Sequence, residues 1–121
     1  MTNDLAERRI LVVEDESLVA MLLETILEDM GCEIVGPEGT VASGVEAARS
    51  VAIDAALLDV NVAGELVFPV AEQLKSRGIP FVFSTGYGEG GLPEQWRGYP
   101  TIQKPFTEVA VHDALLNAMS R

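Results

Sequence analysis

The sequence has 121 residues, 48% of them hydrophobic, which is enough for one domain with its own core. Its 8 basic and 19 acidic residues give a formal net charge of −11, so direct binding to nucleic acid or to an anionic membrane is not expected. The single cysteine, Cys32, excludes an internal disulfide and suits a reducing compartment such as the cytoplasm, and no apolar stretch is long enough to span a bilayer.

The first half of the chain alternates short apolar runs with helical patterns. Residues 10–13 form a continuous run typical of a buried strand, and the run ends in three acids at 14–16. Helical spacing then predicts a helix that begins at Ser17 and ends with a cap at Gly31. The residues expected on the apolar face of this helix are Leu18, Met21, Leu22, Thr25 and Ile26.

A second strand, a second helix and a third strand follow. The second strand contains residues 34–35 and is expected to stop at the Gly-Pro pair 36–37. Thr40 is expected to cap the second helix. The apolar face of that helix is made by Val41, Val45 and Ala48. The apolar run 55–58 predicts the third strand, and Asp59 closes it.

The second half of the chain continues the alternation. A third helix is expected between Gly64 and Gly78. Its inward-facing residues are Val67, Val70, Ala71 and Leu74. Residues 79–83 predict the fourth strand. It is followed by a glycine-rich stretch, 86–93, with the weakest structural pattern in the chain, and by at most a short helix at 94–97.

A short strand and a final helix end the chain. Residues 101–103 predict the fifth strand, Lys104 follows it, and Thr107 is expected to cap the helix. The apolar positions of that helix are Val109, Val111, Ala114, Leu115 and Ala118. Strands that alternate with helices predict an α/β fold, with a parallel sheet covered by helices on both faces and right-handed crossovers. Residues 1–121 are expected to form a single domain.

Polar side chains stand at the ends of four predicted strands. They are Glu14 and Asp15, Asp59, Thr85 and Lys104. The carboxyl ends of parallel strands meet at one edge of a sheet, where binding sites are built. Three carboxylates in one place repel each other, and a bound Mg²⁺ ion with oxygen ligands would relieve this. A carboxylate can also attack phosphorus to give an aspartyl phosphate, whose oxygens a metal, a lysine and a hydroxyl would neutralise.

Four motifs together resemble the receiver domain of two-component response regulators. They are Ile-Leu-Val-Val-Glu-Asp-Glu at 10–16, Leu-Leu-Asp at 57–59, Ser-Thr-Gly at 84–86 and Lys-Pro-Phe at 104–106. They occur in the family's order and spacing and cover almost the whole chain. The resemblance implies a flavodoxin-like fold with strand order 2-1-3-4-5. It also implies a phosphoryl donor, either a histidine kinase or a histidine phosphotransfer protein, and signalling through contacts with a downstream protein.

The resemblance also implies a role for each polar residue. Asp59 would be the phosphoacceptor, Thr85 would hydrogen-bond the phosphoryl group, and Lys104 would pair with it. The residues implied to hold Mg²⁺ are Asp15 directly, Glu14 mostly through water, Asp59, and Asn61 through its backbone carbonyl. The Lys104–Pro105 peptide bond would be cis, which is accessible to an X-Pro bond. Such a receiver catalyses its own phosphorylation and dephosphorylation but is not a turnover enzyme.

Several positions depart from the usual receiver pattern. Thr101 replaces an aromatic residue that swings inward on activation, Ala63 replaces a proline and Gly86 replaces an alanine. The stretch 80–88 resembles a receiver subgroup with a Phe-Ala-Thr-Gly-Tyr signature, associated with stress-response circuits of alphaproteobacteria, with Ser84 in place of the alanine. Without the aromatic switch, we hypothesise that the glycine-rich stretch 86–98 is loose at rest and that phosphorylation orders the segment around 92–97.

Other interpretations stay open at this point. The chain could be an interaction module that keeps the fold without cycling phosphate, or a fragment of a longer response regulator. A phosphatase-type hydrolase would need a second acid two residues after Asp59, where the sequence has Asn61. Trp96 and Tyr99 could form a partner surface or pack onto the sheet, and His112 is expected on an ordinary helix surface.

Overall fold

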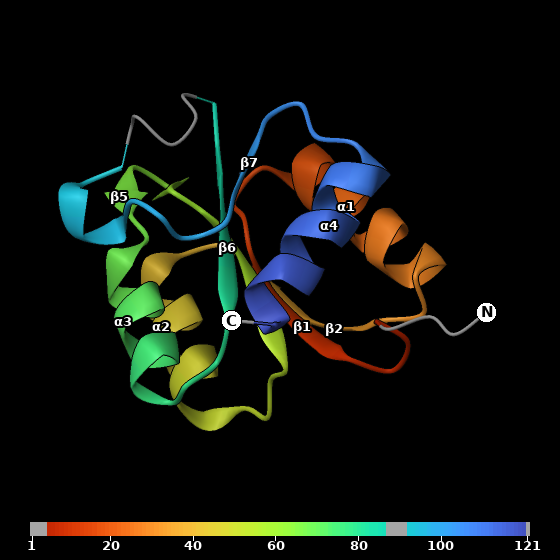
Figure 1. The fold of residues 1–121 in the computed structure, drawn as a ribbon. Coiled ribbons are helices and arrows are strands. Elements are labelled where there is room, and N and C mark those ends of the chain that lie inside the picture. Colours follow the sequence, from red (N-terminus) through yellow and green to blue (C-terminus); the bar gives the residue numbers. More distant parts are fainter. Residues whose placement is uncertain (1–4, 87–91, 121) are drawn as a thin grey trace.

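Five strands form one parallel sheet at the centre of the fold, in the order β2-β1-β3-β6-β7 (Figure 1). The structure is a computed structural model that describes residues 5–86 and 92–120. The strands of the sheet are β1 (Arg9–Val13), β2 (Glu33–Glu38), β3 (Ala55–Asp59), β6 (Phe81–Thr85) and β7 (Thr101–Gln103). Since β6 and β7 are the fourth and fifth strands of this sheet along the chain, the predicted flavodoxin-like order 2-1-3-4-5 is confirmed.

Helices cover both faces of the sheet, as predicted. Figure 1 shows α1 (Ser17–Asp29) and α4 (Glu108–Met119) on one face, and α2 (Val41–Ser50) and α3 (Phe68–Ser76) on the other. Each pair buries its own apolar cluster against the sheet. Between β6 and β7, the described residues contain only one turn of 3₁₀ helix, η2 (Glu94–Trp96), which agrees with the short fourth helix that the sequence predicts.

The apolar face predicted for α1 is wrong in part. Leu18, Met21 and Leu22 are 81%, 59% and 45% exposed. The buried residues of α1 are Ala20, Leu23, Ile26 and Leu27. This helix has two apolar stripes, and periodicity alone does not select the stripe that packs against the sheet. In α4, Val109 was one of the predicted apolar positions and is 68% exposed.

Two strand boundaries also differ from the prediction. β2 does not stop at Gly36-Pro37 but continues to Glu38, because β2 is an edge strand and an edge strand tolerates proline. Gly36 has φ +99° and lies so close to β1 that an added Cβ would be 2.9 Å from the Val12 carbonyl oxygen, so the irregular register there needs glycine. β6 begins at Phe81 rather than at residue 79 and includes Ser84 and Thr85.

A small antiparallel hairpin follows Asp59 and was not predicted. It is formed by β4 (Asn61–Val62) and β5 (Glu65–Leu66). Its two-residue loop has positive φ angles, 51° at Ala63 and 83° at Gly64, as in a type I′ turn. Alanine is an unusual residue at such a position, so the sequence lacks the Asn-Gly signal that normally marks this turn.

The segment hypothesised to be loose at rest is packed where the structure describes it. Leu92 and Trp96 are 2% and 1% exposed, so the hypothesis is wrong for these two residues; residues 87–91 lie outside the described residues. The Trp96 ring stacks on Phe68 at a centroid distance of 5.7 Å, and Tyr99 stacks on Phe81 at 4.9 Å. Of the two interpretations of Trp96 and Tyr99, the structure therefore supports packing onto the sheet. We call Phe68, Phe81, Phe83, Trp96 and Tyr99 the aromatic block.

Candidate functional site

The polar residues predicted to meet do lie at the carboxyl edge of the sheet. Asp59 and Thr85 are the last residues of β3 and β6, while Glu14 and Lys104 directly follow β1 and β7. Pairing in the parallel sheet places Asp59 opposite Ser84, and Thr85 opposite Gln103, the residue before Lys104. The topology therefore brings four separate parts of the sequence to one place.

Three carboxylates converge at this edge. Glu14, Asp15 and Asp59 each offer an oxygen atom, and these oxygens lie within 4.8 Å of one another. Glu14 and Asp59 are buried, whereas Asp15 is exposed. The cluster thus has two sheltered carboxylates and one that faces solvent. Such a group of hard oxygen ligands suits Mg²⁺, which keeps several of its water molecules when it binds to proteins.

Lys104 bridges the two buried carboxylates. Its Nζ atom lies 3.2 Å from Oε1 of Glu14 and 3.2 Å from Oδ2 of Asp59. Because β6 lies between β7 and β3, the side chain of Lys104 crosses the end of β6 to reach them. Burial works to lower the pKa of Lys104, but the carboxylates of Asp59 and Glu14 outweigh this effect and raise the pKa, so the ammonium group stays charged.

The pKa of Glu14 responds both to burial and to the charges beside it. Burial raises the pKa of Glu14 to about 7, and the nearby Asp59 carboxylate adds to this rise. The backbone N–H of Glu16, which donates to Oε2 of Glu14 at 3.1 Å, and the Lys104 ammonium oppose it. The charged form of a carboxylate is disfavoured by burial and by a second carboxylate beside it, and a bound cation would favour that form.

Backbone hydrogen bonds fix the positions of Asp59 and Lys104. The N–H of Asn61, at the start of β4, donates to Oδ1 of Asp59 at 3.3 Å. The N–H of Lys104 donates to the Thr85 carbonyl oxygen at 3.0 Å. The Lys104–Pro105 peptide bond is cis, as the resemblance to receivers implies. The end of β6 therefore supports the lysine through its backbone.

The two hydroxyl residues at the end of β6 face opposite sides of the sheet. Side chains alternate along a strand, and Val82, two residues before Ser84, packs in the cluster under α1 and α4, whereas Phe83, two residues before Thr85, packs in the cluster under α2 and α3. Leu57, two residues before Asp59, belongs to the α1 and α4 side. Ser84 thus shares a face with Asp59, and this placement was not predicted from the sequence. The signal that could have found it is its position level with Asp59 in the sheet.

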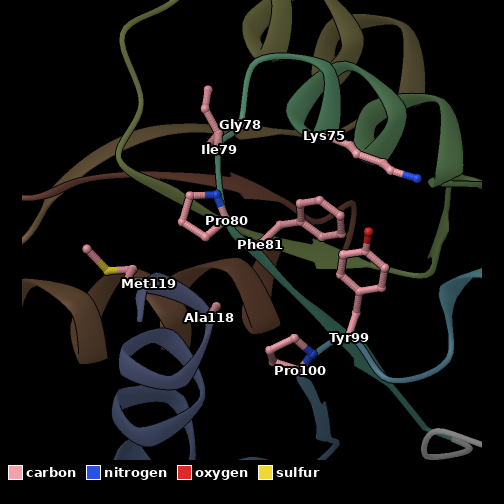
Figure 2. A pocket seen from close by; sticks show the side chains of 9 residues that line it. All are labelled: Lys75, Gly78, Ile79, Pro80, Phe81, Tyr99, Pro100, Ala118 and Met119. Carbon is pink, nitrogen blue, oxygen red and sulfur yellow. The ribbon is translucent and has the colours of Figure 1, made fainter. Parts of the chain in front are cut away.

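The cavity shown in Figure 2 lies away from this carboxyl edge. It has a volume of about 410 Å³ and is found where β6 begins, beside the last residues of α4. Lys75, Phe81, Tyr99 and Met119 are among the residues that line it. Its lining includes none of the predicted site residues, so the carboxylate cluster and this cavity are separate features.

Within residues 5–86 and 92–120, no helix has the length and apolar character needed to cross a membrane.

No model of a known protein family matches the chain. Among solved structures, SdrG from Sphingomonas melonis Fr1 superposes with a TM-score of 0.84 and shares 43% sequence identity, with 100% of each chain covered. The receiver domain of the sensor histidine kinase PA1611 from Pseudomonas aeruginosa PAO1, solved with a magnesium ion coordinated in its active site cleft, gives a TM-score of 0.81. It shares 20% identity over 96% of this chain and 100% of that domain, which shows the fold alone.

Curated proteins give a similar result. The transcriptional regulatory protein PdtaR of Mycobacterium tuberculosis is 32% identical over 118 residues, which cover 94% of this chain. The chain spans 58% of the length of PdtaR, so the similarity concerns one part of that regulator.

Proposed function

Because the chain belongs to the receiver-domain family of response regulators, we propose that it accepts a phosphoryl group on Asp59 in a two-component system or phosphorelay. The observation that carries this proposal is the contact of one lysine with two buried carboxylates. Lys104 lies 3.2 Å from both Glu14 and Asp59, beside the exposed carboxylate of Asp15. A buried nucleophile with a fixed cation at hand is equipped for phosphoryl transfer, where charge neutralisation supplies most of the catalysis.

In the proposed reaction, a carboxylate oxygen of Asp59 attacks the phosphorus atom of a phosphohistidine. The new P–O bond forms as the P–N bond breaks, and the histidine nitrogen keeps the electron pair of that bond. Lys104 pairs with the phosphoryl oxygens, and the hydroxyl of Thr85 donates to one of them once the Thr85 side chain turns to this side of the sheet. The backbone N–H of Asn61 holds the Asp59 carboxylate in place.

The residues present fit a magnesium ion. Carboxylate oxygens of Glu14, Asp15 and Asp59 and the backbone carbonyl of Asn61 would hold it, and the ion would supply charge stabilisation at the phosphoryl oxygens. Three carboxylates meet here beside one ammonium group, that of Lys104, which supports a further cation at this place. The carboxylates of Glu14 and Asp15 would then act as ligands, and Asp59 as both ligand and nucleophile.

The first turns of α1 offer a surface for the phosphoryl donor. Leu18, Met21 and Leu22 are exposed, and α1 begins only two residues after Asp15. An apolar surface beside the site suits a histidine kinase or a histidine phosphotransfer protein, whose phosphohistidine must reach Asp59. Residues 1–121 would form one receiver domain that works in the cytoplasm and passes the signal to a downstream protein.

The proposal is tested by incubating the protein with acetyl phosphate and Mg²⁺ and measuring its intact mass. We expect wild type to gain one phosphoryl group and Asp59→Asn to gain none. Asp113→Asn, which changes an exposed aspartate on α4, is the matched control and should be labelled like wild type. An unlabelled wild type would favour the interaction module that does not cycle phosphate, and equal labelling of Asp59→Asn would remove Asp59 as the acceptor.

A further inference from the structure

Ser84, near the end of β6, carries a buried hydroxyl group. The residue is 2% exposed, and its Oγ atom has no hydrogen-bond partner among the residues that the structure describes. A buried hydroxyl without a partner costs stability, and most buried polar side chains in native proteins avoid this cost. An alanine at this position would avoid the cost, because it has no hydroxyl group. The hydroxyl at this position therefore calls for a state of the protein in which it has a partner.

Ser84 lies on β6, the strand between β3, which carries Asp59, and β7, which Lys104 follows. Ser84 is the strand partner of Asp59 on β3 and of Ile102 on β7. Ile102 packs in the cluster under α1 and α4, so alternation puts Ser84, Asp59 and Lys104 on that face of the sheet. Lys104 contacts Asp59 from the far side of β6, so its side chain crosses the end of the strand that carries Ser84.

The resting state gives the Asp59 carboxylate two donors. Oδ1 faces the N–H of Asn61 at 3.3 Å, and Oδ2 faces Nζ of Lys104 at 3.2 Å. If Lys104 turns toward an arriving phosphoryl group, the contact between its ammonium group and Oδ2 weakens. Water does not freely replace that contact, because Asp59 is buried. A neighbouring hydroxyl on the same face and at the same level of the sheet is the group that can replace it.

We propose that Ser84 is a positioning residue for Asp59, whose hydroxyl donates a hydrogen bond to the Asp59 carboxylate when Lys104 turns to the phosphoryl group. This hydrogen bond fixes the orientation of the Asp59 carboxylate, so that the attacking oxygen keeps pointing toward the phosphorus atom. The inference rests on the proposed function of Asp59. It adds a residue that acts through the acceptor and does not itself contact the phosphoryl group.

The test compares wild type, Ser84→Ala and Ser84→Thr, with acetyl phosphate as the donor at saturating Mg²⁺. In Ser84→Ala, the labelling rate at saturating donor should fall about tenfold, which is the lower end of what a hydrogen bond to a charged group supports. The donor concentration at half-saturation should stay the same, because Ser84 does not bind the donor. Ser84→Thr keeps the hydroxyl and should recover most of the rate.

Thermal unfolding of the unlabelled proteins separates this role from a merely structural one. Ser84→Ala should unfold at the same temperature as wild type or higher, because it removes a buried hydroxyl that has no partner at rest. Ser76→Ala, at the exposed end of α3, is the control and should match wild type in both measurements. Wild-type labelling rates in Ser84→Ala, or equally slow Ala and Thr variants, would overturn the inference. An unlabelled wild type would instead overturn the proposed function.

Discussion

The two faces of the sheet carry different chemistry at the same edge. On the face covered by α1 and α4, the strands end in Glu14, Asp59 and Lys104, three charges in contact. On the face covered by α2 and α3, the end of β6 carries Phe83, which packs edge-on against both Phe68 and Trp96. The polar cluster and the aromatic block are thus separated by the thickness of one sheet.

This difference follows from the alternation of side chains along a strand. In β6 the consecutive residues Phe83 and Ser84 face opposite sides, and in β3 Leu58 and Asp59 do the same. Each strand therefore contributes one residue to the stable core and the next residue to the site. Stability on one face and phosphoryl chemistry on the other should then respond to different mutations, and the predictions below test that separation.

The largest effect is expected from the exposed carboxylate of the charged face. Asp15→Ala should abolish labelling by acetyl phosphate, because Asp15 is the exposed carboxylate of the cluster and the proposed direct ligand of Mg²⁺. Glu14→Ala should only weaken labelling. The measurement is intact mass over time, with Glu16→Ala as the control for loss of an adjacent exposed acid. Labelling that persists in an excess of chelator would contradict the proposed Mg²⁺ site.

On the opposite face, Trp96→Ala should lower the free energy of unfolding by about 3–5 kcal/mol, since it removes a large, fully buried ring from the aromatic block. Denaturant titration measures this, and Val109→Ala, at an exposed apolar position, should stay within about 0.5 kcal/mol of wild type. Folded Trp96→Ala should still be labelled at the wild-type rate. A slower rate in the folded variant would show that the two faces are coupled.

The sequence predicts the arrangement of the charged face better than that of the aromatic face. Polar residues at the ends of parallel strands must share an edge, so the meeting of Glu14, Asp59 and Lys104 follows from the alternating pattern of strands and helices. The aromatic block joins Phe68 on α3 with Phe83 and Trp96, which are distant in sequence. No local sequence pattern predicts such contacts, because they depend on tertiary packing.

Local patterns also failed where two arrangements fit equally well. The apolar residues of α1 form two stripes, and only the packing surface of β1 and β3 selects Leu23 and Leu27 over Leu18. The β4–β5 hairpin was missed because its turn uses Ala63 at positive φ, where asparagine is usual. Ser84 was noted only as a departure from a signature, since its level in the sheet becomes evident only once β3 and β6 are paired.

A smaller effect is expected from pH in the metal-free protein. Glu14 has a pKa of about 7 in the folded state against an ordinary value of 4.5, so the folded protein binds the proton more tightly than the unfolded chain does. This contribution to stability is complete below pH 4.5 and is lost as pH rises through 7. Chemical denaturation with chelator present should show a loss on the order of 2 kcal/mol between pH 5 and 8.

A substitution at Glu14 tests whether this residue causes the dependence of stability on pH. Glu14→Gln cannot titrate and should flatten the dependence of stability on pH over this range, whereas Glu16→Gln, at an exposed neighbour, should leave it as in wild type. Adding Mg²⁺ to wild type should restore stability at pH 8, because the proposed ion replaces the missing proton as the compensating positive charge. A wild-type slope that persists in Glu14→Gln would assign the pH effect to another group.

The smallest effects are expected from removing two helix N-caps, one on each face of the sheet. The Thr40 hydroxyl oxygen accepts from the Ser43 N–H at 3.1 Å at the start of α2, and the Thr107 hydroxyl oxygen accepts from the Ala110 N–H at 3.1 Å at the start of α4. Replacing either threonine with alanine should cost about 1 kcal/mol, as expected for the loss of an N-cap. Denaturant titration should therefore not distinguish Thr40→Ala from Thr107→Ala.

Labelling should distinguish these two variants. Thr107 follows Lys104 by three residues, so fraying of the first turn of α4 should loosen the segment that carries the lysine. Thr40 lies on the connection from the edge strand β2 to α2, so fraying of α2 should leave that segment in place. Because a small misplacement of a charged group slows transfer, Thr107→Ala should lower the labelling rate by about two- to threefold, with Thr40→Ala unchanged. If both variants slow labelling equally, the site depends on global stability, and the two faces are not separate in function.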